Sequence, residues 1–473
     1  MAKLKPYPRY KDSGVPWLVN IPAHWDLVKM KYLLSERKEK GFPGEPLLAA
    51  TQTKGVILKN QYENRTVLAL KDLHLLKLVE RGDYVISLRS FQGGIEYAHF
   101  RGIISPAYTI LKPSARVQRG FFEPFFKSAG FVSGLSLCVT GIREGQNIDY
   151  VRLSRMPMPV PPVEEQLAIG RYLRAELGKI NQIIRAKRRL IELLNEQKQA
   201  IIQRAVTRGL DPDVRLKPSG IDWLGDVPGH WGIWQIGHIA KVGNGSTPSR
   251  GNRSYWNDTG YPWLNSSSVN RTFITSADQF VTDLALRECH LPQVQPDSVL
   301  VAITGQGKTR GKAAILRIEA TINQHIAYIA PQTRRMSSEF LHLELTAAYT
   351  RLRAVSDDSG STKGALTCED LKHFRIALPP QNEQIQVVTA VRKEVQELEV
   401  AIDKAQREID LIREYRIRLI TDVVTGKLDV RDVELPALEE TEEELTAEED
   451  ATGDAIEPDA ELETAEEHVD VAD

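Results

Sequence analysis

Two stretches of the chain carry apolar residues at a spacing that alternates between four and three positions. In the stretch after Pro162 these are Leu173, Leu177, Ile180, Ile184, Ile191, Leu194, Ile201 and Ala205. In the stretch after Pro380 they are Val391, Val395, Leu398, Ile402, Ile409, Ile412, Leu419 and Val423. This heptad spacing is typical of coiled-coil helices. With proline pairs before them and Gly209 and Gly426 after them, the stretches predict two helices of about 44 residues, roughly 65 Å long.

A helix with a single apolar stripe needs a second surface to cover it, and the other copy of the stripe is the nearest candidate. An antiparallel pair is the simplest arrangement, because a whole domain separates the two helices in the sequence. A coiled coil between separate chains is the alternative, and the repetition inside one chain favours the internal pair. We expect the two helices to bind each other through Leu173, Ile180, Ile191, Leu194, Leu398, Ile409, Ile412 and Leu419.

The repetition extends beyond the helices. KDSGVPWLVNIPAHW (11–25) matches KPSGIDWLGDVPGHW (217–231) at an offset of 206 positions, and VPPVEEQLAIGRYLR (160–174) matches LPPQNEQIQVVTAVR (378–392) at 218. A weaker match joins 82–94 to 296–308 at 214. The chain therefore contains two units, each a globular head followed by a helix. Their ends are alike and their middles differ, which suits a protein that must contact two different targets.

The heads contain short β-rich runs, such as residues 84–87 and 298–302, between glycine and proline turns. We therefore predict an α+β protein with two mixed α/β heads separated by two long helices that form an intramolecular antiparallel coiled coil. The expected limits are 1–155 for the first head, 156–210 for the first helix, 211–373 for the second head, 374–430 for the second helix, and 431–473 for an acidic, disordered tail.

The charge of the chain is distributed unevenly. Its formal net charge is −2, but residues 434–473 hold 18 of the 63 acidic residues and no lysine or arginine. Residues 1–433 therefore carry 61 basic and 45 acidic residues, a net charge of +16. A body this basic favours a polyanionic partner such as DNA. The three cysteines lie far apart, which fits a reducing, cytoplasmic location, and no apolar run approaches the ~20 residues that span a membrane.

These features together resemble a known family, the specificity subunits of type I restriction-modification systems. The resemblance covers about 10–430 and rests on the ordered set of motifs: SGVPWL…IPAHW, Gly245-Ser246-Thr247-Pro248, Tyr255-Trp256, Pro262-Trp263, SPAYTIL (105–111) and GSTKGALTCEDLKHFRIALPPQNEQ (360–384) before the long helix. The first-half counterpart, residues 141–166, departs from the pattern because it lacks Ser-Thr.

The resemblance implies a non-catalytic subunit that reads double-stranded DNA. Each head would be a target recognition domain for one half of a split, asymmetric site, and the helices would set the spacer and dock two modification subunits. The partners would carry the cofactors: S-adenosylmethionine on the methyltransferase subunits, and ATP and Mg²⁺ on restriction subunits that translocate and cleave DNA. The recognition subunit of a type IIB system is a close alternative.

Reading DNA requires arginine or lysine for phosphates and guanine, and asparagine or glutamine for adenine. Several segments of the heads are rich in these residues. The candidates in the first head are Gln52, Lys54, Arg89, Ser90, Gln92 and Arg101. Those in the second head are Arg250, Asn252, Arg253, Asn265, Ser266, Gln306, Lys308, Arg310 and Lys312.

One motif points to a different function. Residues 302–309 (AITGQGKT) fit a loose phosphate-binding P-loop, which would make the chain an ATPase with a coiled-coil stalk. A P-loop needs a helix to begin at its lysine, but the segment after Lys308 resembles a strand, so we predict a hairpin tip. A scaffold that recruits partners without DNA is a third hypothesis. No Asn-Pro-Pro-aromatic motif for adenine methylation occurs, and we interpret Cys289-His290, His24 and His230 as structural.

Overall fold

The computed structural model describes residues 4–62, 72–140, 147–305, 308–332, 334–357 and 364–434. The chain forms two compact units, and the boundary between them falls inside both long helices. The first unit joins Met1–Ala186 to Glu408–Asp473, and the second unit is Lys187–Arg407. Each unit therefore contains one head together with part of each helix. The limits of the five segments predicted from the sequence stay a prediction.

The two long helices are α5 (Val163–Arg208) and α11 (Gln381–Val424). Both begin directly after a proline pair, where proline restrains the preceding backbone but leaves the first helical turn free to form. Both end before a glycine with positive φ: Gly209 at 70° and Gly426 at 75°. A left-handed residue ends a helix because it turns the chain away from the helical path. The predicted pair of long helices is confirmed.

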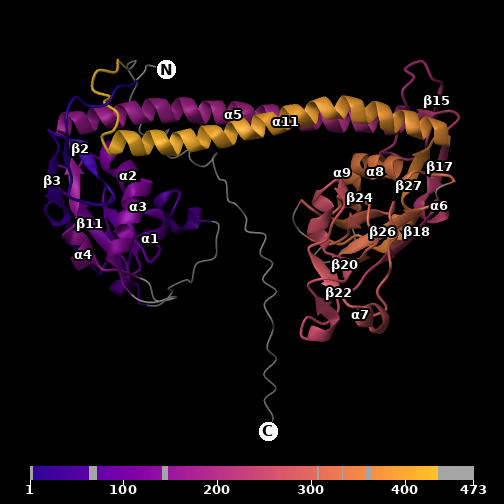
Figure 1. Cartoon of the computed structure of the whole chain (residues 1–473), viewed down its shortest axis with the longest axis horizontal. Coiled ribbons are helices and arrows are strands. Elements are labelled where there is room, and N and C mark those ends of the chain that lie inside the picture. Colours follow the sequence, from indigo (N-terminus) through magenta and orange to yellow (C-terminus); the bar gives the residue numbers. More distant parts are fainter. Residues whose placement is uncertain are drawn as a thin grey trace, which may run out of the picture. The chain divides into compact units, whose positions relative to one another are not determined.

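Within each unit the two helices lie side by side and run antiparallel (Figure 1). In the first unit, Tyr172 near the start of α5 lines a pocket with Tyr415 near the end of α11. In the second unit, Lys198 near the end of α5 forms an ion pair with Glu399 in the first half of α11. The heptad residues Leu173, Ile180, Ile409 and Leu419 are buried, whereas Ile191, Leu194, Leu398 and Ile412 are half-buried.

The head of the first unit is built from small antiparallel sheets, the largest of which has the strand order β4-β11-β8-β9. Short helices cover it (Figure 1). Its strands are β1 (Tyr10–Asp12), β2 (Asn20–Pro22), β3 (Asp26–Lys29), β4 (Leu34–Arg37), β5 (Leu48–Thr51), β6 (Gly55–Leu58), β7 (Lys77–Val79), β8 (Tyr84–Ile86), β9 (Glu96–Tyr97), β10 (Gly102–Ile104), β11 (Thr109–Pro113), β12 (Val139–Thr140), β13 (Asn147–Ile148) and β14 (Pro157–Val160). Its helices are α1 (Ser90–Gly93), α2 (Arg119–Lys127), α3 (Ala129–Leu135) and α4 (Tyr150–Ser154).

The head of the second unit has a five-stranded sheet with the strand order β18-β26-β23-β24-β21 and a four-stranded sheet with the order β19-β22-β20-β25. Its strands are β15 (Leu216–Pro218), β16 (Asp226–Pro228), β17 (Gly232–Gln235), β18 (Ala240–Asn244), β19 (Trp256–Asn257), β20 (Tyr261–Leu264), β21 (Phe273–Ile274), β22 (Gln279–Val281), β23 (Val299–Ala302), β24 (Ala313–Leu316), β25 (Thr321–Ile322), β26 (Ile326–Pro331) and β27 (Arg375–Leu378). Its helices are α6 (Ile236–Ile239), α7 (Asp283–Glu288), α8 (Ser338–Ala347), α9 (Tyr349–Asp357) and α10 (Cys368–His373). The predicted α+β class is confirmed.

The repeated sequence segments form the same frame in both units. The strand after the His-Trp pair (β3 or β17) pairs antiparallel with the strand before the proline pair (β14 or β27). Each frame closes around a tryptophan with no exposed surface, Trp25 in one unit and Trp231 in the other. The divergent part of each head lies between the two framing strands in the sequence. Among the described residues, no helix is long and apolar enough to cross a membrane.

Candidate nucleic-acid interface

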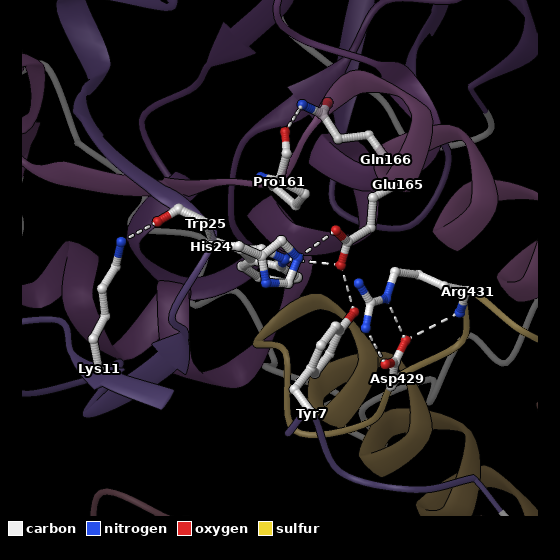
Figure 2. Close-up of polar contacts among 9 residues, drawn as sticks. All are labelled: Tyr7, Lys11, His24, Trp25, Pro161, Glu165, Gln166, Asp429 and Arg431. Atoms are coloured by element: carbon white, nitrogen blue, oxygen red, sulfur yellow. Dashed lines mark hydrogen bonds and ion pairs between the residues drawn. The ribbon is translucent and has the colours of Figure 1, made fainter. Parts of the chain in front are cut away.

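A buried carboxylate joins the first head to α5. Glu165 lies in the first turn of α5, and its side chain is 5% exposed. Its Oε1 accepts hydrogen bonds from the Tyr7 hydroxyl (2.7 Å) and from Trp25 Nε1 (2.9 Å), and its Oε2 lies 2.7 Å from His24 Nε2 (Figure 2). Burial and the bond to Glu165 raise the pKa of Tyr7. Three partners on one carboxylate hold the start of the helix against the opening segment of the head.

The second unit repeats this junction with its own residues. Glu383 accepts a hydrogen bond from Trp231 Nε1 (3.0 Å) and lies 2.7 Å from His230 Nε2. The following glutamine also has the same role in both copies: Gln166 donates to the Pro161 carbonyl (2.9 Å) and Gln384 to that of Pro379 (3.0 Å). Both histidines therefore make structural contacts, the role that the sequence analysis favoured.

Each junction also receives the end of the other helix. A Cβ added to Gly426, just beyond α11, would lie 2.3 Å from Pro22 and 3.1 Å from Trp25. A Cβ added to Gly209, just beyond α5, would lie 3.3 Å from Trp231. Only glycine therefore fits at position 426 without a shift of its neighbours, and both glycines also need their positive φ. The junctions fix both helices to each head, and the candidate DNA-contacting residues lie elsewhere on the heads.

In the first head, candidate residues lie on two neighbouring loops. Gln52 and Lys54 belong to the tight turn between β5 and β6, which the Thr51 hydroxyl stabilises by accepting from the Lys54 amide (2.9 Å). Gln92 lies in α1, and Arg89 is the residue directly before that helix. The loops approach closely, because a Cβ on Gly93 would lie 3.0 Å from the Gln52 side chain. Gln52, Arg89 and Gln92 are exposed. The structure thus brings two pairs of candidates onto neighbouring loops, although the pairs are 35 to 40 positions apart in the sequence.

Two other candidates of the first head are engaged within the protein. The Ser90 side chain is buried, and its hydroxyl accepts a hydrogen bond from the Ser87 amide (2.8 Å). Arg101 forms ion pairs with Glu45 (2.8 Å) and Glu80 (2.5 Å), and the bond to Glu45 is the main cause that raises its pKa. Because the Ser90 side chain is buried, its position does not support direct contact with DNA. The charge of Arg101 is balanced by the two glutamates.

In the second head, Arg250 is the most firmly held exposed candidate. Its guanidinium carbon lies 4.3 Å from the ring centre of Trp256 and 5.1 Å from that of Trp263. Its Nη2 donates to the Gln279 side chain (3.1 Å). The tryptophans also fix the loop that carries Arg250, because their indole N–H groups donate to the Ser249 and Ser246 carbonyls. A guanidinium held in one orientation while exposed is suited to reading a base edge.

The neighbouring asparagines shape turns. The Asn252 side-chain oxygen accepts from the Ser254 amide (3.1 Å), and that of Asn265 accepts from the Ser267 amide (3.0 Å). Their oxygens are therefore engaged in local turns, a common use of asparagine. Arg253 is exposed and Ser266 is half-buried. These residues and Arg250 come from segments that flank the β19-β22-β20-β25 sheet.

The described residues of the segment that resembles a P-loop, 302–305 and 308–309, run from the last residue of β23 into the connection between β23 and β24. Residues 308–311 are a turn, and the next element is strand β24, so no helix begins at Lys308. The Arg310 side chain is buried, and its Nη1 donates to the Gly364 carbonyl (2.6 Å). Lys312 Nζ donates to the Asn270 side chain (2.8 Å), and Gln306 lies outside the described residues. Exposed Lys308 fits the predicted hairpin tip, whereas the burial of Arg310 argues against its direct contact with DNA.

Sequence reasoning missed the residues that hold the loops in place. Trp256 and Trp263 were noticed only as motif letters, although their position after Arg250 is the signal that could have suggested a stacked guanidinium. Lys127, whose Nζ donates to the Gln52 and Gly93 carbonyls, gives no sequence signal, because these partners lie 34 to 75 positions away in the sequence. Among the described residues, no group of three or more histidine, cysteine, aspartate or glutamate side chains could hold a metal ion.

The sequence is similar to proteins of type I restriction-modification systems. Residues 228–404 match the model of the type I restriction modification DNA specificity domain. The chain is 23% identical over 255 residues to the type I restriction enzyme EcoR124I/EcoR124II specificity subunit of Escherichia coli, covering 54% of this chain and 58% of that protein. It is 21% identical over 287 residues to a putative type I restriction enzyme MjaX specificity subunit of Methanocaldococcus jannaschii, covering 60% and 62%. The chain thus spans about three fifths of these relatives.

The fold also has a solved counterpart. A chain from a structure of a type I restriction-modification system, described in terms of complex assembly and conformational transition, superimposes with a TM-score of 0.62 at 15% identity. The match covers 86% of this chain and 99% of that one. At this identity the likeness concerns the fold alone. Residues 228–404 therefore match the DNA specificity domain of type I restriction-modification systems, and the chain resembles the specificity subunits of those systems, as its sequence motifs predicted.

Proposed function

We propose that the chain is the DNA-sequence-specificity subunit of a type I restriction-modification complex and is not itself catalytic. The observation that carries the proposal is the duplicated frame around unlike heads. The match to the DNA specificity domain covers most of one head, and the same junction chemistry, Glu165 or Glu383 with its His-Trp pair, recurs around the other. A duplicated frame that carries two different heads suits a DNA site made of two different halves.

The proposed site is asymmetric because the heads differ where they would read DNA. The first head offers a hairpin turn beside a short helix, with Gln52, Arg89 and Gln92 exposed. The second head offers a loop whose Arg250 is stacked on tryptophans. Glutamine can pair with an adenine edge and arginine with a guanine edge, and each good bidentate pair contributes about 1–3 kcal/mol of discrimination. The +16 charge of residues 1–433 supports attraction to phosphates.

The proposed partners bind along the helices. Exposed apolar residues recur at equivalent positions of the two copies: Leu167 and Ile385 near the helix starts, and Leu193 and Leu411 further along. Equivalent apolar positions suit two copies of one partner, which we infer to be the modification subunits. Those subunits would hold S-adenosylmethionine, and restriction subunits would bring ATP and Mg²⁺. An ATPase in this chain has less support, because no helix follows Lys308.

The test is a domain exchange in the assembled complex. Residues 241–373 are replaced by those of a relative, the complex is reconstituted with its modification subunits, and the methylated sequence is mapped on genomic DNA. We expect one half of the site to change and the other half and the spacer to stay the same. The two-head proposal is refuted if both halves change together or if neither changes in a complex that still methylates DNA.

The role of the helices as a spacer is tested separately. Four residues are inserted at one layer of α5 and at the facing layer of α11, so that the apolar stripes stay matched. Four residues of helix add about 6 Å, close to the rise of two base pairs. We expect methylation to move to sites with a longer spacer and unchanged half-sites. An unchanged spacer contradicts the proposed ruler without touching the assignment of the heads.

A further inference from the structure

Two loops of the first head are joined by one lysine. We define the β-turn loop as residues 51–54 and the α1 loop as residues 87–93. Lys127, the last residue of α2, donates from Nζ to the Gln52 carbonyl in the β-turn loop (3.1 Å) and to the Gly93 carbonyl at the end of the α1 loop (3.0 Å). It also forms an ion pair with Glu96 in β9 (2.6 Å). An ammonium has three N–H donors, and here each has a partner.

We propose that Lys127 is a positioning residue that fixes the two DNA-reading loops of the first head in a single arrangement. The inference rests on the proposed function of the heads and assigns a new role to a residue outside the predicted contact set. Lys127 acts through the backbone carbonyls of the loops, so the side chains of Gln52, Arg89 and Gln92 stay available to DNA. Its own side chain is only 28% exposed.

The packing around Lys127 fixes the end of α2 against the α1 loop. The side chain of Phe126, beside Lys127, is fully buried among phenylalanines, which anchors the end of α2. A Cβ on Gly94, directly after the α1 loop, would lie 2.0 Å from the Phe126 carbonyl oxygen. The backbones of α2 and the α1 loop are therefore in direct contact. Glu96 is buried, and burial raises its pKa to about 7 although Lys127 opposes the shift. Loss of Lys127 would leave this carboxyl without its ion pair.

The second head holds the equivalent loop with different residues. In the sequence repeat, Lys308 and Arg310 of the turn after β23 correspond to Gly94 and Glu96, which directly follow the α1 loop. Tyr349 of α9 donates to the Lys308 carbonyl (2.7 Å), and Arg353 donates to the Arg310 carbonyl (3.3 Å). In both heads a helical segment therefore holds the backbone at or next to this stretch of the repeat, and the side chains used are unrelated. This parallel is a second observation in favour of a positioning role.

The test uses the complex reconstituted with its modification subunits and a selection from random DNA. Lys127→Met is compared with Lys112→Met, which removes an exposed lysine on β11 of the same head. We expect Lys127→Met to lose at least about tenfold discrimination in one half-site only, and Lys112→Met to keep both. The salt dependence of binding should not change, whereas loss of a phosphate contact would reduce the slope of log K against log salt by about 0.9.

A second variant separates positioning from folding. Lys127→Met combined with Glu96→Met removes the buried carboxyl together with its partner, which avoids an unpaired charge. Hydrogen exchange on the free chain should increase at residues 51–54 and 90–94 in both variants and stay unchanged at 308–312. Full discrimination at both half-sites, or unchanged exchange in both loops, overturns the inference. A wild-type complex that selects no sequence refutes the proposed function instead, so the two failures are distinguishable.

Discussion

Replacing Glu344 by methionine should stabilise the second unit. Glu344 lies on α8 and has no exposed surface, and neither of its carboxyl oxygens has a hydrogen-bond partner among the described residues. Burial raises its pKa well above the usual value, so the folded protein holds the carboxyl in its neutral form. A buried polar group without partners costs about 1–3 kcal/mol. Methionine has a similar length and no such cost, so we expect a gain of about 1–3 kcal/mol at pH 5.

The first head supports this expectation. Phe121 contacts Trp25 edge-on in the first unit, as Phe340 contacts Trp231 in the second. Four residues after Phe121 is buried Phe125, and four residues after Phe340 is Glu344. An equivalent helix position therefore accepts an apolar side chain in one copy of the frame. The frame therefore does not require a carboxyl at position 344.

The gain should grow with pH. Between the unfolded pKa of 4.5 and the higher folded pKa, the folded state keeps a proton that the unfolded state releases. The wild type therefore loses stability at up to about 1.4 kcal/mol per pH unit over that range, and the methionine variant does not.

Denaturant unfolding of the full chain at pH 5 and pH 8 measures both effects. Glu344→Gln serves as the matched control, because it should remove the pH dependence while keeping an unsatisfied polar group. Parallel pH curves for wild type and Glu344→Met, or a destabilised methionine variant at pH 5, would refute the reasoning.

Three other predictions concern single features. Arg250→Ala should relax selection at one position of one half-site at a cost of about 1–3 kcal/mol, measured by competition between site variants; a uniform loss across sequences would indicate a phosphate contact. Burial lowers the pKa of His342 to about 4, so the second unit should lose stability as pH falls from 6.5 towards 4, and His342→Leu should remove that slope in unfolding curves. Removal of residues 435–473 should raise affinity for non-specific DNA at low salt, because the tail is acidic and the body basic; equal affinity would exclude a screening role.

The helices were predictable because their signals are local. A heptad stripe, a proline pair and a terminal glycine each act within a few residues, and α5 and α11 lie between the proline pairs and the glycines that the sequence provides. The structural role of His24 and His230 followed from their equal places in the repeat. The internal pairing followed from the repetition within one chain, and its antiparallel direction followed from the domain that separates the two helices in the sequence.

The candidate site was less predictable because its geometry depends on contacts between distant segments. Ser90 and Arg310 have the chemistry of DNA-contacting residues, yet both side chains are buried. Nothing near Ser90 or Arg310 in the sequence indicates that their side chains point inward, because the packing of the whole head decides which side of a loop faces outward. Arg250 was recognised from its residue type, but its restraint by Trp256 and Trp263 required the loop geometry.

The two copies keep the same side chains where geometry must be equal and differ where targets would differ. The glutamate, histidine and tryptophan of each junction match in both chemistry and distance. The loop anchors do not match, because Lys127 serves one head and Tyr349 the other. A shared anchor would tie the backbone of both reading loops to one conformation, whereas separate anchors let each loop adopt its own. Duplication of the frame with independent anchors therefore allows one head to change its target without altering the other.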